Sequence, residues 1–245
     1  MDWKYIIMDL WRTRNLQEWA NHRFKAKDRI VLETHDLRAI QTKSGALFAA
    51  NEVVGNALNL YREYDLSDIR PTDTVLDIGA CVGGFSIPAA MRATEGRVIA
   101  VEPLYADELR ENIALNGLED RVTVIEAGIG SGEPMHVRYM GREKTIPTLA
   151  MSDINHRFGR VDFLKCDCEG GEWAIVPGDL HGIRRIELEV HLGRQSVLPE
   201  NPDLLSYLRA HYTVQTNEKR RPDNGAYWHC HPHVSMMVEN RNDKR

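Results

Sequence analysis

Two carboxylates follow a predicted buried strand and are well placed for chemistry. Asp167 and Glu169 come directly after an apolar strand predicted over residues 161–166. Alternation along an extended chain would put both carboxylates on the same side. The carboxyl ends of parallel strands border the ligand crevice of an open α/β sheet. We therefore expect a carboxylate pair that faces a binding site, with Asp167 as the leading candidate for a base or a metal ligand.

The next predicted strand, over residues 184–190, adds two candidates on one face, Glu189 and His191. Acids in a central strand are costly unless they are paired or have a function. We interpret both side chains as part of the catalytic group around Asp167. The alternative is a structural network with the neighbouring basic residues Lys165, Arg184 and Arg185.

A glycine-rich turn after the predicted strand 74–78 is suited to holding a ligand. Asp77 interrupts this apolar strand near its end, and the glycines that follow let the backbone approach a bound molecule closely. A buried carboxylate needs a partner. We expect Asp77 to pair with backbone amides of its own loop or with a cationic ligand.

The residues of this turn disfavour a dinucleotide. A pyrophosphate site requires Gly-x-Gly-x-x-Gly, and Cys81 occupies the middle glycine position. A nucleoside ligand fits better, because Asp77 and Gly79 end the first core strand and Glu102 ends the second, where it can hold a ribose diol. With an antiparallel last hairpin, these features indicate a class I methyltransferase that binds S-adenosylmethionine.

The elements that position these residues alternate between strand and helix, which is typical of a parallel sheet covered on both faces. The predicted core strands span residues 74–78, 98–101, 122–125, 161–166 and 184–190. The predicted helices span about 84–94, 106–116, 151–158 and 201–210. Two further strands, 212–215 and 234–238, have no helix between them and should pair antiparallel. The expected fold is an α/β, Rossmann-like sheet, mostly parallel, with an antiparallel final strand.

An N-terminal extension over residues 1–70 precedes the predicted methyltransferase domain, residues 71–245. It contains a predicted amphipathic helix over residues 1–28, a hairpin over 29–41 and a helix over 51–64. We interpret the first helix as packed on the core. A substrate lid and a homodimer contact are the alternatives.

Several motifs resemble those of the FkbM family of class I S-adenosylmethionine-dependent methyltransferases. The resemblance covers residues 73–190 and rests on four segments, residues 77–86, 101–103, 116–117 and 161–172. It implies methyl transfer to a hydroxyl of a sugar, glycan or polyketide-like acceptor. The chain departs from the family pattern at Cys81, where Asn is common, and at Cys168 and Gly171, where a β-branched residue and Ala are common.

The resemblance also implies which residues contact the cofactor. Asp77 and the turn from Gly79 to Gly84 would hold the methionine end, Glu102 the ribose, and Glu126 with Ala127 the adenine. The full implied set is Asp77, Gly79, Ala80, Cys81, Gly83, Glu102, Pro103, Glu126 and Ala127. A hydroxyl acceptor must lose its proton, so a general base or a divalent metal ion is required. No metal-ligand set is assigned.

Three interpretations stay open for the motif of residues 229–233, His-Cys-His-Pro-His. They are an ordinary polar loop, an acceptor contact and a metal site. As a metal motif it is weak, because alternation separates the histidines from Cys230 and Pro232 disrupts the geometry. Two alternatives to the overall function also stay open: an RNA or protein methyltransferase on the same core, and a regulatory module that binds the cofactor without catalysis.

Composition narrows the class of protein. The 245 residues carry a formal charge of −5, which provides no general attraction to nucleic acid. No apolar run approaches the roughly 20 residues of a membrane helix, and no secretory signal is recognised. The four cysteines show no disulfide pattern. We expect a cytoplasmic protein with free thiols, no membrane span, no nucleic-acid partner, and a small-molecule or glycan acceptor.

Overall fold

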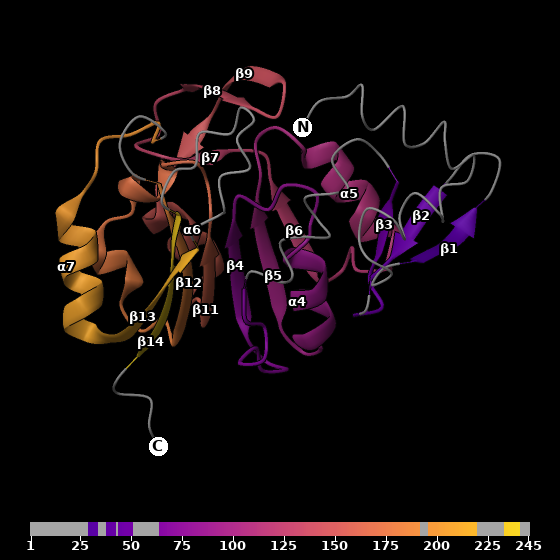
Figure 1. The fold of residues 1–245 in the computed structure, drawn as a ribbon, viewed down its shortest axis with the longest axis horizontal. Helices are drawn as coiled ribbons and strands as arrows, with labels where there is room; N and C mark the ends of the chain where they lie inside the picture. The colour runs from indigo at the N-terminus through magenta and orange to yellow at the C-terminus, as the bar shows by residue number, and fades with distance from the viewer. Residues whose placement is uncertain are drawn as a thin grey trace.

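A seven-stranded sheet forms the centre of the computed structural model, which describes residues 29–33, 38–42, 44–50, 64–191, 196–219 and 233–240 (Figure 1). The strand order is β13-β14-β12-β11-β4-β5-β6. The strands are β4 (Thr74–Ile78), β5 (Arg97–Val101), β6 (Val122–Ile125), β11 (Phe163–Cys166), β12 (Arg185–Val190), β13 (Tyr212–Lys219) and β14 (His233–Asn240).

Strand directions confirm the expected Rossmann-like sheet. Neighbouring strands from β12 to β6 pair in parallel, whereas β14 runs antiparallel to both β12 and β13. Continuous apolar strands are expected here because both faces of a parallel sheet are buried. The predicted strand over 161–166 begins later, at Phe163. Just before it, the Asp162 side chain accepts a hydrogen bond of 3.0 Å from the backbone amide of Thr74.

Helices cover both faces of the sheet, as predicted. One apolar cluster joins Val75 and Phe163 of the sheet to Leu109 of a covering helix, and a second cluster joins Leu76 and Leu164 to the opposite layer. This division follows from the period of two along each strand. The first layer contains α4 (Ser86–Arg92) and α5 (Ala106–Leu115). The second contains α6 (Met151–Phe158), α7 (Pro202–His211) and the 3-10 helices η1 (Gly171–Ala174) and η2 (Pro177–Leu180).

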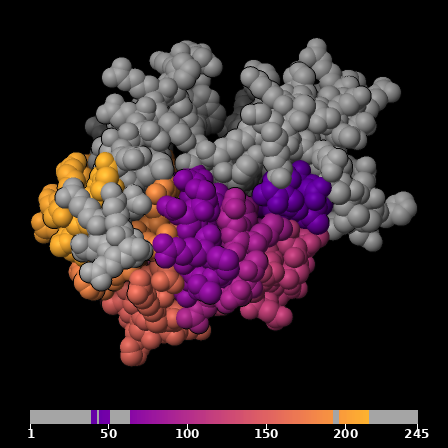
Figure 2. All heavy atoms as spheres, turned by 90° about the horizontal axis from the view of Figure 1, so that it is seen from below, coloured from indigo at the N-terminus to yellow at the C-terminus, as the bar shows by residue number. Residues whose placement is uncertain are grey.

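The predicted N-terminal hairpin is present and gains a third strand. β1 (Arg29–Glu33), β2 (Arg38–Gln41) and β3 (Leu47–Ala49) form an antiparallel sheet. β3 is fixed to α5, because the amides of Leu47 and Ala49 donate to the side chains of Asn116 and Asn112 at 2.9 and 2.8 Å. Seen from below, β2 and β3 lie at the opposite end of the molecule from α7 (Figure 2).

Some predicted elements lie outside the described residues. They are the helix over 1–28, the helix over 51–64 except Tyr64, and residues 229–232 of the histidine motif. Three cysteines that the structure describes, Cys81, Cys166 and Cys168, are free thiols, as expected. None of the described helices is long and apolar enough to cross a membrane.

The segment between β6 and β11 contains more strand than the sequence indicated. Two short parallel strands and a hairpin form here. The short strands are β7 (Gly128–Ile129) and β10 (Thr148–Leu149), and the hairpin, here called the pocket hairpin, is β8 (Met135–Tyr139) with β9 (Arg142–Ile146).

A buried ion pair joins the two central strands. Asp77 and Lys165 are register partners on β4 and β11, both side chains are fully buried, and Lys165 Nζ lies 3.1 Å from Asp77 Oδ1. Asp77 Oδ2 accepts a hydrogen bond of 2.5 Å from Ser86 at the start of α4. Lys165 Nζ also donates to the carbonyl of Gly79 at 2.8 Å. One side-chain pair therefore fixes two strands, a helix start and the glycine turn.

Replacing Lys165 by methionine should destabilise the protein by about 3–5 kcal/mol, because Asp77 would be left as an uncompensated buried charge. Urea unfolding would measure the change. The double variant with Asp77→Asn should recover a large part of the loss, since the amide oxygen of the introduced asparagine could still accept from Ser86 without a charge. Equal losses in the single and double variants would contradict this account of the pair.

Candidate active site

The glycine turn after β4 touches the start of the loop after β11. Gly79 has a φ of +77°, and a Cβ at this position would lie 1.8 Å from the carbonyl oxygen of Asp167. The adjoining Cys81 also has positive φ, at +50°. Only glycine allows the two loops to meet at Gly79, so the turn and the catalytic candidates form one unit.

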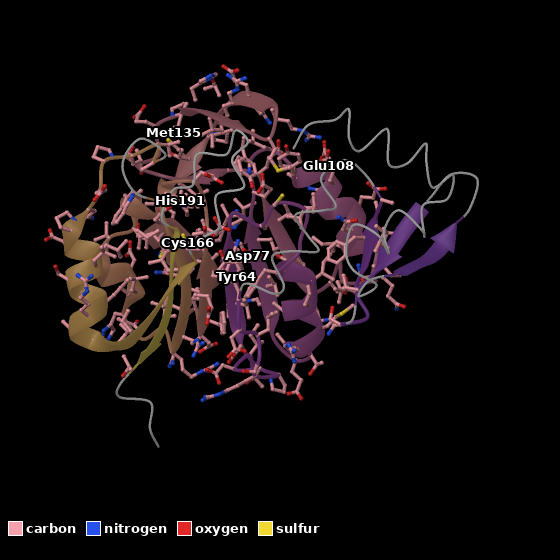
Figure 3. All side chains as sticks on the ribbon, viewed as in Figure 1. Tyr64, Asp77, Glu108, Met135, Cys166 and His191 are labelled. Carbon is pink, nitrogen blue, oxygen red and sulfur yellow. The ribbon has the colours of Figure 1, made fainter. Side chains whose placement is uncertain are left out.

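An open pocket of about 810 Å³, which includes the solvent at its mouth, lies above this turn. Its wall is formed by the ends of β4 and β5, the segment 127–129 around β7, the pocket hairpin, the loop after β11, and Val197. Figure 3 shows Asp77 and His191 near the middle of the sheet, with Met135 of the pocket hairpin above them. The wall includes Gly79, Cys81, Val101, Glu102, Leu104, Ala127, Ile129, Met135, Val137, Tyr139, Asp167 and Glu169.

Glu102 is held rigidly at the edge of this pocket. Its Oε2 accepts from the amide of Cys81 at 2.7 Å, and its Oε1 accepts from the amides of Leu104 and Tyr105 at 2.6 and 3.0 Å. Burial raises the pKa of Glu102, and these amides together with Lys165 oppose that rise. Because a carboxylate has about four acceptor positions, one stays available for a ligand hydroxyl.

Two basic side chains attach the pocket hairpin to the rest of the domain. Arg142 donates to the carbonyl of Leu104 at 2.7 Å, forms an ion pair with Glu108, and lies 4.2 Å from the ring centre of Tyr105. Lys144 forms an ion pair of 3.0 Å with Glu126. The hairpin thereby covers the end of the pocket above β5 and β6.

The predicted cofactor residues fall into two groups. Five line the pocket: Gly79, Cys81, Glu102, Pro103 and Ala127. The structure places the other four, Asp77, Ala80, Gly83 and Glu126, outside the pocket wall. Asp77 is occupied by Lys165 and Ser86, a partner pair that the sequence did not indicate. Glu126 points to Arg110 and Lys144.

The four predicted catalytic side chains come together. Asp167, Glu169 and His191 each have a polar atom within 4.8 Å of the others. Glu189 joins them through Tyr64, whose hydroxyl lies 3.0 Å from Asp167 Oδ2 and 3.1 Å from Glu189 Oε2. Burial, followed by the charges of Asp167 and Glu189, raises the pKa of Tyr64 well above its usual value. Tyr64 is therefore a neutral phenol that donates to this carboxylate pair.

Glu172 fixes both the backbone and the ring of His191. Glu172 Oε1 accepts from the backbone amide of His191 at 2.6 Å and lies 3.1 Å from His191 Nδ1. Burial alone would lower the pKa of His191, but the carboxylates of Glu172, Glu169 and Asp167 outweigh it and raise this pKa to about 9. The imidazole is therefore charged at neutral pH when the protein is alone.

Sequence reasoning missed Tyr64 and Glu172 as parts of the site. Tyr64 precedes the first core strand and shows no pattern that connects it with Asp167. Glu172 had a usable signal, because it lies in the same acid- and glycine-rich segment as Asp167. The pocket hairpin had one too, since Met135, Val137 and Tyr139 alternate and all three line the pocket.

The sheet order, the glycine turn and the carboxylate group at the strand ends define a Rossmann-like methyltransferase. The chain belongs to the FkbM methyltransferase domain family, whose sequence model matches residues 77–213, more than half of the chain. The expected family is thus confirmed.

A relative found by sequence matches only part of this chain. The chain is 33% identical over 92 residues to ribosomal protein L11 methyltransferase of Carboxydothermus hydrogenoformans, a match over 37% of this chain and 30% of that protein. The chain therefore spans less than a third of that relative.

Two solved structures are similar to this chain at low identity. An FkbM methyltransferase from Methylobacillus flagellatus has 17% identity and a TM-score of 0.48, covering 77% of this chain and 55% of its own. The fibrillarin pre-rRNA processing protein of Methanococcus jannaschii has 14% identity and a TM-score of 0.49, covering 87% and 94%.

Replacing Gly79 by alanine should cost about 3 kcal/mol or more, because the added methyl would overlap the Asp167 carbonyl and separate the two loops. Gly117→Ala is the matched control. Gly117 also has positive φ, at +62°, but nothing lies within 4 Å of its added Cβ. The control should cost only about 1–2 kcal/mol. Similar losses in both variants, measured by urea unfolding, would show that the close approach at Gly79 is unimportant.

Stability should fall as pH rises from 6.5 to about 9, because the folded protein keeps the proton of His191 longer than the unfolded chain does. This contribution is complete below pH 6.5 and amounts to about 3 kcal/mol at most. His191→Gln should remove this part of the pH dependence, as measured by urea unfolding across the range. His181→Gln, at an exposed histidine, should not change it. An unchanged slope in His191→Gln would contradict the assignment.

Proposed function

We propose that this protein transfers a methyl group from S-adenosylmethionine to a hydroxyl of a sugar, glycan or polyketide-like small molecule. The position of Asp167 carries the proposal, because this side chain both lines the pocket and belongs to the polar group with Glu169 and His191. Membership of the FkbM family supports methyl transfer. A carboxylate at the pocket wall can take the proton that a hydroxyl must lose, which supports a hydroxyl acceptor.

The pocket residues suit this cofactor. The backbone of Gly79 and Cys81 is available to the methionine end, Glu102 to the ribose hydroxyls, and Ala127 to the adenine. When bound, S-adenosylmethionine supplies an activated methyl group on a positively charged sulfur. Carboxylates on the wall favour a positively charged ligand over a phosphate-bearing one.

Asp167 is the side chain assigned to the acceptor hydroxyl, as the group that takes its proton or as a ligand of a cation that makes the proton easier to lose. Tyr64 holds Asp167 Oδ2, which leaves Oδ1 on the side of His191. Alignment of the acceptor accounts for much of the rate in a direct displacement.

An RNA acceptor has weaker support. Phosphate backbones are bound through basic side chains, whereas Glu102, Asp167 and Glu169 line this pocket and the chain has a net charge of −5. A regulatory module without catalysis would have no use for the buried polar group around Asp167. A small hydroxylated acceptor is therefore preferred to both.

Calorimetric titration should detect binding of S-adenosylmethionine and S-adenosylhomocysteine and no binding of NAD. With a panel of monosaccharides and glycosides as acceptors, release of S-adenosylhomocysteine should reveal a substrate. Asp167→Asn should lower that turnover by about 100-fold or more, the contribution typical of a general base, while both ligands still bind.

Glu143→Gln is the matched control, since it makes the same change in charge on the exposed side of the pocket hairpin. Its turnover should equal that of the unmodified protein. Binding of NAD alone would overturn the cofactor. Wild-type turnover in Asp167→Asn would overturn the role of this carboxylate.

A further inference from the structure

Two side chains of the pocket wall, Asp167 and Glu169, and the buried His191 next to them bring one possible donor atom each into a small region. His191 Nε2 lies 3.5 Å from Glu169 Oε2 and 3.9 Å from Asp167 Oδ1, and all three donor atoms lie within 4.8 Å of one another. These separations exceed the roughly 2.7–3.2 Å of N–H···O hydrogen bonds. Donors that share one cation at bonds of about 2.1 Å lie about 3.0–3.4 Å apart. The three donors are thus too far apart for direct hydrogen bonds with one another and slightly further apart than the ligands of one cation, so a cation between them would draw them together.

Residues outside this trio fix the orientation of two of the donors. Tyr64 holds Asp167 Oδ2 at 3.0 Å, so Oδ1 is the oxygen that faces His191. Glu172 holds His191 Nδ1 at 3.1 Å, so Nε2 is the nitrogen that faces the two carboxylates. A carboxylate on the second ring nitrogen is the usual support for a metal-binding imidazole.

Burial keeps the Glu172 and His191 side chains in a fixed orientation. Glu172 is fully buried, and its Oε2 is itself fixed by the amide of Gly170 at 2.9 Å. His191 is only 2% exposed. Such a constrained imidazole cannot swing away to solvent, so its Nε2 stays on the side of Asp167 and Glu169.

The negative charges around these donors also favour a bound cation. The carboxylates of Asp167, Glu169, Glu172 and Glu189 meet within one small region. The imidazolium of His191 offsets one of these four charges when no metal ion is bound, and Lys165, the buried cation beside them, is already paired with Asp77 at 3.1 Å. Concentrated negative charge in a poorly solvated region is unfavourable unless a cation offsets it.

We propose that Asp167 Oδ1, Glu169 Oε2 and His191 Nε2 bind a divalent cation at the wall of the methyl-transfer pocket. Two oxygens and one imidazole nitrogen suit Mn²⁺ better than Mg²⁺, because Mg²⁺ prefers oxygen ligands throughout. Three protein ligands leave further positions for water or an acceptor oxygen. Resting on the proposed function, the cation lowers the pKa of the acceptor hydroxyl.

The test uses the full chain after chelator treatment, with Mn²⁺ alone as the probe. Loss of the free Mn²⁺ signal in electron paramagnetic resonance should report one saturable site. Glu169→Gln should weaken this binding at least tenfold, and its half-exposed side chain makes it the variant least apt to disturb folding. His191→Gln should abolish binding, with circular dichroism to verify the fold.

Glu143→Gln controls for surface binding, because Glu143 and His136 form an exposed acid–imidazole pair of 2.8 Å on the pocket hairpin. It should bind Mn²⁺ as the unmodified protein does. Absence of a saturable site, or binding unaffected by both Glu169→Gln and His191→Gln, would overturn the proposal.

The titration needs neither cofactor nor acceptor, so its failure is distinct from failure of methyl transfer. Binding of S-adenosylmethionine without binding of Mn²⁺ would remove the cation and leave the proposed function intact. Binding of Mn²⁺ without binding of S-adenosylmethionine would keep the cation site and overturn the proposed function. Where both bind, chelator should reduce turnover at least tenfold and Mn²⁺ should restore it; turnover indifferent to chelator would overturn the role given to the cation.

Discussion

The ion pair between Asp77 and Lys165 sets the positions of nearly everything around the pocket. Lys165 lies two residues before Asp167, and its amino group also holds the carbonyl of Gly79. Asp77 lies two residues before Gly79 and accepts from Ser86 of α4. A charged pair fixes the register of β4 against β11, because a slip of one residue between the strands would leave both charges buried alone. The glycine turn after β4 and the loop after β11 that carries Asp167 and Glu169 are thus fixed by the same contact.

The polar group above this pair is built in layers. Glu172 and Tyr64 are buried and touch the reactive candidates without lining the pocket, whereas Asp167 and Glu169 line it. Rigid support of this kind keeps carboxylates oriented in a region where water cannot reorganise around them. It also explains why Glu189 lies within β12 and His191 directly after it, since each has an inward partner.

Much of the fold could be predicted because burial on both faces leaves a plain signal, such as the continuous apolar run that contains Val75 and Leu76. The strand ends then indicated Asp167, Glu169, Glu189 and His191 as neighbours. The partner of Asp77 could not be predicted, because periodicity gives the face of Lys165 but not its register. Tyr64 was missed because its contact with Asp167 is purely tertiary. Glu126 was expected near a ligand, but strand position alone does not show which way a side chain turns at an exposed edge.

The antiparallel insertion of β14 between β12 and β13 has a consequence for biosynthesis. β12, which carries Glu189, has its second neighbour more than forty positions further along the chain, at residues 233–240. On the ribosome, β12 therefore stays an open sheet edge after the glycine turn and β11 have already been made. Unpaired edges of this kind invite pairing with other chains. Until β14 has been made, has left the ribosome and has paired with β12, this edge can pair with other chains, and the pairing of β14 then covers it.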